Sequence, residues 1–175
     1  MADADRNFDP IGLIGVLVGH EVDFVVIGGL AGTLHGSPLV TGDLDVCPGR
    51  KTENTGRLAR ALVELDAKEY DVRKDIWMDR DWSPEMLEVD TTWMLITRLG
   101  RLDLLFEPAG TSGYEDLKRR QAFFSLGDHG VAAASVEDLI RMKEAAGRPR
   151  DVAAVPILRK LLNEPEPDGW ASPDL

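Results

Sequence analysis

A compact apolar run that ends in two glycines sets the first constraint on the fold of this chain. The run extends from Val22 to Ile27, is rich in β-branched residues and stops at Gly28–Gly29. A short, nearly continuous apolar run bounded by glycines is typical of a buried strand. Because such a strand must be covered by other elements, we expect it inside a sheet that packs against helices.

The rest of the chain alternates helical and strand-like patterns. The first predicted helix, 11–18, has an apolar stripe of Ile11, Ile14 and Val18, and a short helix is expected over 30–35. A third helix begins after Thr52 as its N-cap and carries Leu58, Leu62 and Leu65 on one face. The last two are 136–146, which opens with a capping box from Ser135 to Asp138, and 151–162, which contains Pro156. The predicted strands are 22–27, 43–46, 92–97 and 102–106, the last two forming a hairpin with the four-residue connection 98–101. Residues 66–90 are expected to be irregular or edge structure. This order predicts an α/β (α+β) fold with a mixed sheet flanked by helices.

The length of 175 residues corresponds to a single domain. We expect it to occupy residues 1–163, followed by a Pro- and acid-rich tail over 164–175. The chain lacks the apolar segment of about 20 residues that a membrane span requires, and its start does not resemble a signal peptide. Its one cysteine, Cys47, cannot form an internal disulfide. These features predict a soluble, cytoplasmic protein without a membrane partner.

Three aspartates are the candidate metal ligands. Asp43 and Asp45 are two residues apart in a strand-like segment, so both carboxylates point to one face. Asp103 is a lone acid in an apolar strand, where an acid is costly unless it is paired or bound to a metal. Mg²⁺ (or Mn²⁺) prefers such oxygen ligands, and three carboxylates on adjacent strands can hold two ions for a phosphoryl displacement. The alternative is that Asp43 and Asp45 only form a solvated strand edge.

Gly28 and Gly29 end a strand where a helix begins, and the free N–H groups there suit a phosphate. Ser37 and Thr41 flank the loop before the acids and are candidates for hydrogen bonds to the same phosphate. Turn formation explains all four residues equally well.

Several separated motifs occur in the order found in one superfamily. The first is Val26–Ala31, which contains Gly28–Gly29, and it is followed by His35–Gly36 and by Thr41–Val46, which contains Asp43 and Asp45. Thirteen residues lie between Gly29 and Asp43. The later motifs are Gly100–Leu104, Ser135–Lys143 and Ala146–Asp151. Together they resemble the nucleotidyltransferases of the DNA polymerase β type, in particular small bacterial members related to abortive-infection, type IV toxin-like nucleotidyltransferases. The resemblance implies the polymerase β-type fold, an NTP substrate and metal ligation by Asp43, Asp45 and Asp103. Relatives often carry a basic residue before the Asp-x-Asp, where this chain has Leu39–Val40.

Lys143 continues the apolar stripe of Val136, Leu139 and Ile140, so it either snorkels to the surface or enters a cleft. In the related toxins a lysine and an aspartate at the positions of Lys143 and Asp151 are needed for activity. The resemblance therefore implies that Lys143 binds the triphosphate and that Asp151 belongs to the catalytic set. Asp151 is equally well placed to be the N-cap of the last helix.

The resemblance implies transfer of an NMP from an NTP to an acceptor, and the acceptor is the open part of the function. The net charge of −11 argues against a protein that coats nucleic acid. Residues 98–160 nevertheless carry 11 basic and 9 acidic side chains. Their basic residues include Arg98, Arg101, Lys118, Arg119, Arg120, Arg141, Arg148 and Arg150. We therefore favour RNA such as tRNA as a toxin-like acceptor. The alternatives are an antitoxin-type or antibiotic-modifying enzyme acting on a protein or a small molecule, with a cognate toxin or antitoxin as partner, or a non-catalytic nucleotide-binding module.

Overall fold

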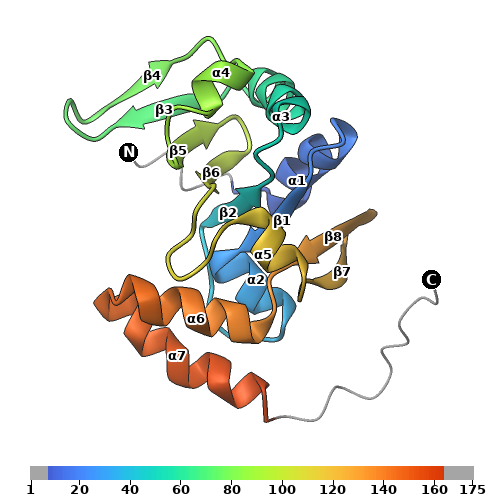
Figure 1. The fold of residues 1–175 in the computed structure, drawn as a ribbon, viewed down its shortest axis with the longest axis vertical. Helices are drawn as coiled ribbons and strands as arrows, with labels where there is room; N and C mark the ends of the chain where they lie inside the picture. The colour runs from blue at the N-terminus through green and yellow to red at the C-terminus, as the bar shows by residue number, and fades with distance from the viewer. Residues whose placement is uncertain (1–7, 164–175) are drawn as a thin grey trace.

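The computed structural model describes residues 8–163, and the predicted tail 164–175 lies outside the described residues. Helices surround one sheet (Figure 1). The helices are α1 (Pro10–Gly19), α2 (Gly28–Leu34), α3 (Thr52–Glu64), α4 (Pro84–Leu87), α5 (Tyr114–Lys118), α6 (Val136–Ala146) and α7 (Pro149–Leu161). The strands are β1 (Phe24–Ile27), β2 (Asp43–Pro48), β3 (Lys68–Asp71), β4 (Ile76–Asp79), β5 (Thr92–Thr97), β6 (Gly100–Leu105), β7 (Ala122–Leu126) and β8 (His129–Ala133). None of the helices in residues 8–163 has the length and apolar character needed to cross a membrane.

Strand β2 lies in the middle of the sheet, whose strand order is β4-β3-β5-β6-β2-β1-β8-β7. It runs antiparallel to β1 and parallel to β6, and β1 runs parallel to β8. The remaining neighbours are antiparallel, including the hairpins β3–β4, β5–β6 and β7–β8. The prediction of a mixed sheet flanked by helices is therefore confirmed.

Helix α3 packs as its sequence predicts, because Leu58, Leu62 and Leu65 are all fully buried. In α1 the predicted stripe is largely wrong. Ile14 is buried, but Ile11 is 44% and Val18 37% exposed. The line that packs against the core is Leu13, Ile14 and Leu17. Both lines have helical spacing and α1 is apolar nearly all round, so periodicity alone could not decide between them.

The hairpin β5–β6 is confirmed, but its predicted four-residue connection is wrong. Only Arg98 and Leu99 join the two strands. The Thr97 hydroxyl closes the turn, donating to the Gly100 carbonyl at 2.8 Å and accepting from the Leu99 amide at 3.0 Å. The strand alternation therefore continues through Gly100 and Arg101, which the sequence had assigned to the connection.

Two helix starts and one hairpin also differ from the predictions. Lys51 rather than Thr52 is the N-cap of α3, since the Thr52 hydroxyl bonds to Glu88 instead. Helix α7 begins at Pro149, where the fixed φ of proline suits the first helical turn. The β7–β8 hairpin was not predicted, because its exposed Phe123 and its small residues hide the usual alternation. The prediction of irregular or edge structure for residues 66–90 is confirmed only in part, because β4 is an edge strand but β3 is paired on both sides and α4 is a regular helix.

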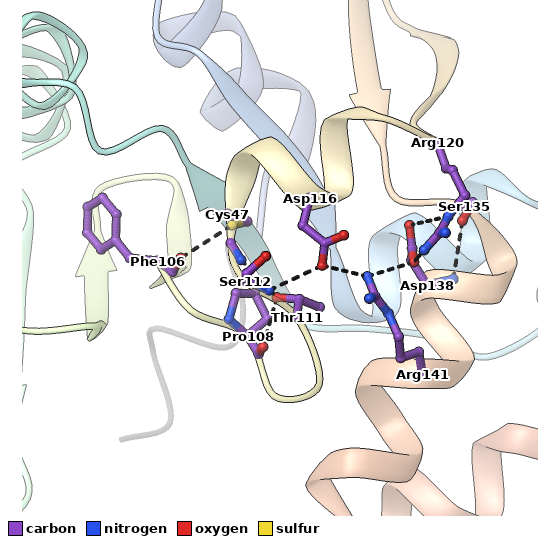
Figure 2. Close-up of polar contacts among 11 residues, drawn as sticks. Cys47, Phe106, Pro108, Thr111, Ser112, Asp116, Arg120, Ser135, Asp138 and Arg141 are labelled. Atoms are coloured by element: carbon purple, nitrogen blue, oxygen red, sulfur yellow. Dashed lines mark hydrogen bonds and ion pairs between the residues drawn. The ribbon is translucent and has the colours of Figure 1, made fainter.

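A chain of ion pairs connects α5 to the first turns of α6 (Figure 2). Arg141 lies 2.9 Å from both Asp116 and Asp138, and Asp138 also pairs with Arg120. The Ser135 hydroxyl caps α6 by accepting from the Asp138 amide, so this half of the predicted capping box is confirmed. Because the Asp138 side chain is fully buried, its carboxylate depends on the two arginines for charge compensation.

Replacing Asp138 by Asn should therefore lower the free energy of unfolding by about 1–3 kcal/mol, since the buried network loses its negative charge and one of its two acceptor oxygens. Glu144→Gln is the control, because the Glu144–Arg159 pair is solvent-exposed and its loss should change stability by no more than about 0.5 kcal/mol. Urea unfolding followed by circular dichroism measures both variants. Equal effects of the two substitutions would contradict a stabilising role for the network.

Candidate active site

The three predicted aspartates lie together on β2 and β6. The parallel register pairs Asp45 with Asp103, while Asp43 lies two residues away on the same face of β2. Each of the three half-buried side chains offers one carboxylate oxygen, and these oxygens lie within 4.8 Å of one another. We call Asp43, Asp45 and Asp103 the carboxylate triad.

Small residues around the triad fix its geometry. The Thr41 hydroxyl donates to the Asp43 carboxylate at 2.6 Å, which orients that side chain. Gly28 has a φ of +65°, and a Cβ there would collide with the Asp45 carboxylate. A Cβ on Gly29 would lie 2.7 Å from the Thr41 side chain. Both glycines therefore allow the start of α2 to approach the acids, a close approach that only glycine permits.

The electrostatics of the triad favour a bound cation. Burial raises the pKa of Asp45 to about 7, and the neighbouring Asp43 and Asp103 add to the shift. Burial and the charge of Asp43 likewise raise the pKa of Asp103 to about 6. One oxygen of Asp103 is also buried without a hydrogen-bond partner among residues 8–163. A hard divalent cation would supply the missing partner and relieve the repulsion, so the donor set fits Mg²⁺ or Mn²⁺.

Lys143 lies beside the triad and contacts Asp151. Its Nζ is 3.3 Å from one carboxylate oxygen of Asp151, and the Arg148 Nε is 2.5 Å from the other. Burial opposes ionisation of Asp151, but the hydrogen bonds from Arg148 and Lys143 outweigh it and lower its pKa. Arg148 is the N-cap of α7. The alternative that Asp151 caps this helix is therefore wrong, and Asp151 instead holds Lys143.

Arg150 and Arg101, two of the basic residues that the sequence offered as contacts for phosphate or acceptor, also act on the triad. The positive charge of Arg150 lowers the pKa values of both Asp45 and Asp103 against the effect of burial. Arg101 is the cross-strand partner of Asp43, and its Nε is buried with no hydrogen-bond partner in the described part of the chain. The sequence feature that could have predicted the position of Arg101 is its two-residue spacing from Asp103. Two residues at this spacing in one strand lie on the same face.

Ser37 and His35 have structural contacts. The buried Ser37 accepts a hydrogen bond from the Leu39 amide in its own loop. His35 bonds to the Ala134 carbonyl at 2.8 Å and packs edge-on against Phe124. Neither hydrogen bond links the residue to the triad.

Comparison with solved structures shows a nucleotidyltransferase fold. No protein-family model and no curated protein matches the chain. TM1012 from Thermotoga maritima, provisionally assigned as a nucleotidyltransferase, is 19% identical with a TM-score of 0.54 and covers 87% of this chain and 89% of its own. The lincosamide antibiotic adenylyltransferase LnuA, in its lincomycin-bound structure, is 11% identical with a TM-score of 0.59, over 89% of this chain and 99% of its own. The antibiotic-resistance factor ANT(2'')-Ia is 14% identical with a TM-score of 0.57, and the match covers 86% of this chain and 80% of ANT(2'')-Ia.

Without divalent cations, ionisation of Asp45 should destabilise the fold. Its pKa in the folded protein, about 7, is above the ordinary value of 3.8, so stability should fall as pH rises from about 4 to about 7. Asp45→Asn removes this effect. We expect the variant to melt at a higher temperature than the unsubstituted protein at pH 8 and at a similar temperature near pH 4.

Differential scanning calorimetry in a chelating buffer measures this pH dependence. Asp81→Asn is the matched control, because Asp81 is exposed and lies outside the triad. A difference between Asp45→Asn and the unsubstituted protein that does not change with pH would contradict the electrostatic account of the triad.

Proposed function

We propose that this protein is a metal-dependent nucleotidyltransferase that transfers an NMP from an NTP to an acceptor hydroxyl. The observation that carries the proposal is the carboxylate triad, which lies beside the glycine-lined start of α2. The nucleotidyltransferase fold of the similar structures supports it.

In this proposal Asp43, Asp45 and Asp103 hold the divalent cations. Bound Mg²⁺ supplies charge neutralisation at the reacting phosphate and lowers the pKa of the attacking hydroxyl. Gly28 and Gly29 offer backbone N–H groups to the phosphates, and the Thr41 hydroxyl keeps Asp43 oriented toward the ions.

The proposed reaction is an in-line displacement at the α-phosphorus. The acceptor oxygen forms a bond to that phosphorus, the bond to the oxygen bridging to the β-phosphate breaks, and pyrophosphate leaves with the electron pair. The proton of the acceptor hydroxyl passes to a carboxylate oxygen of Asp103. Lys143 and Arg150, whose positive charges act on Asp45, are proposed to bind the triphosphate. They would supply the positive charge that the Leu39–Val40 loop lacks.

The predicted basic patch around Lys118–Arg120 gives an RNA acceptor little support. Asp138 pairs with Arg120 and Arg141, so neither arginine is free to neutralise a phosphate. Lys118 lies over the Tyr114 ring. The similarity to the lincosamide antibiotic adenylyltransferase LnuA and to the antibiotic-resistance factor ANT(2'')-Ia favours small-molecule antibiotics as a second acceptor class.

Nucleotide transfer can be tested with each of the four α-labelled NTPs, Mg²⁺ and, separately, total RNA, cell protein or hydroxylated antibiotics. We expect label on one acceptor class, release of pyrophosphate and loss of both with Asp45→Asn. The proposal is contradicted if no acceptor is labelled or if the variant transfers label as well as the unsubstituted protein does.

Lys143→Met tests the triphosphate role of this lysine. The substitution keeps the apolar stem and removes the charge, while Arg148 still pairs with Asp151, so the fold should be retained. We expect NTP affinity to fall by about tenfold, roughly the 1.4 kcal/mol of one charge-assisted contact. Isothermal titration with a non-hydrolysable NTP measures this affinity, and Lys160→Met, at an exposed position of α7, is the control. Unchanged affinity in Lys143→Met would exclude the triphosphate role.

A further inference from the structure

The carboxylate triad is continuous with a row of side chains that crosses three more strands on the same face. Cross-strand pairing places Asp45 opposite Asp103 and Asp103 opposite Met94. On β3, Glu69 pairs with Leu95, so the next residue, Tyr70, lies on the face of Met94. Tyr70 in turn pairs with Trp77 of β4. The sheet thus presents acids, a methionine and two aromatic rings in sequence across one surface.

This surface is accessible from solvent. Along β5 the residues Trp93 and Leu95 are buried on the opposite face, where Trp93 packs against Trp82. Met94 and Ile96, on the face of the triad, are only half-buried. Figure 1 shows β3 and β4 extending the sheet beyond β5, away from α6 and α7. The row therefore forms an open face rather than an enclosed cavity.

The aromatic pair is pre-arranged for stacking. The rings of Tyr70 and Trp77 are 5.0 Å apart and tilted by 49°, and the Tyr70 hydroxyl is fixed by a hydrogen bond to Asp75. Both side chains are partly exposed. We call Tyr70 and Trp77 the aromatic platform.

Arg101 lies on β6 two residues from Asp103, in the row of cross-strand partners next to the row that joins the triad to the platform. It is the partner of Asp43 on one side and of Ile96 on the other. Its Nε is buried and has no hydrogen-bond partner within residues 8–163, as is the case for one oxygen of Asp103. The proposed cation accounts for the Asp103 oxygen, so the buried Arg101 Nε is the donor that remains for an acceptor oxygen of a ligand, such as a phosphate oxygen.

We propose that this face binds the end of a single-stranded RNA, with its terminal ribose hydroxyl at Asp103, a backbone phosphate at Arg101 and a base stacked on the aromatic platform. The acceptor role rests on the proposed nucleotidyl transfer, in which that hydroxyl oxygen attacks the α-phosphorus, its proton passes to Asp103 and pyrophosphate leaves. Stacking bases on aromatic rings beside a positive charge is the common way to bind single strands.

The spacing of the row favours a strand over a small molecule. Neighbouring strands are about 4.8 Å apart, so the platform begins two strands, roughly 10 Å, from Asp103. The base of the terminal nucleotide would then cover Met94, and the preceding base would reach Tyr70 and Trp77. A drug-sized acceptor would instead need a concave pocket that encloses it. The β3–β4 hairpin, residues 68–80, carries four basic and four acidic side chains, so it does not repel a polyanion as the whole chain does.

Equilibrium binding of a short RNA, labelled at its 5′ end, tests the platform without nucleotide transfer. Loss of one base–aromatic stack is worth about 1–3 kcal/mol, so Trp77→Ala should weaken binding by about 5- to 150-fold, while Trp77→Phe should retain most of the affinity. Ile76→Ala is the matched control, since Ile76 is the exposed neighbour on the other face of β4 and should leave binding unchanged. An RNA with an abasic penultimate nucleotide should bind the unsubstituted protein more weakly than the intact RNA does. The Trp77→Ala variant should bind the abasic and the intact RNA with equal affinity.

Nucleotide transfer to the same RNA provides the second measurement. Trp77→Ala should raise the KM for RNA and leave both kcat at saturating RNA and the affinity for NTP near those of the unsubstituted protein. Equal RNA affinity of the Trp77→Ala and Ile76→Ala variants would show that the aromatic platform does not bind RNA. Label transferred only to protein or to an antibiotic would overturn the RNA acceptor and leave the proposed function intact. RNA bound at the platform without transfer to any acceptor would contradict the proposed function and, with it, the acceptor role.

Discussion

Repulsion among three carboxylates on two adjacent strands is the constraint around which the central part of this molecule is arranged. Parallel pairing of β2 and β6 brings Asp45 opposite Asp103, and the strand alternation puts Asp43 on the same face. Burial keeps water from screening these charges, so the pKa values of Asp45 and Asp103 rise. Such a cluster destabilises the fold when its carboxylates are ionised, and it provides the oxygen ligands that a hard cation prefers.

The elements around the triad follow from this constraint. Gly28 lets the start of α2 pass close to Asp45, where any side chain would collide. Helices α6 and α7 are joined through Gly147, which ends α6 in the left-handed conformation and turns the chain so that Asp151 faces Lys143. Asp151 also pairs with Arg148, so it does not neutralise Lys143 alone. The charge of Lys143 therefore still acts on Asp45. Backbone geometry and ion pairing therefore place a positive charge beside the acids without neutralising them completely.

The sequence predicted those features that depend on local pattern. The leucines of α3, the Ser135 cap and the shared face of Asp43 and Asp45 each follow from residues a few positions apart. Features that depend on strand register or on distant ion pairs were not predictable in this way. Whether Arg101 meets Asp43 depends on where the β5–β6 turn closes, and whether Arg120 is free depends on Asp138, eighteen positions further along. The row from Asp103 to Trp77 likewise needs the pairing of four strands, which no local periodicity specifies.

The central claim is that the triad, as one unit, holds the cations that position an NTP. The most direct measurement is a crystal structure with Mn²⁺ and a non-hydrolysable NTP, in which anomalous scattering locates the metal. The account predicts manganese bound by oxygens of Asp43, Asp45 and Asp103 and by the nucleotide phosphates, with Lys143 on the triphosphate. Manganese and nucleotide bound elsewhere, with the three carboxylates free of metal, would contradict it.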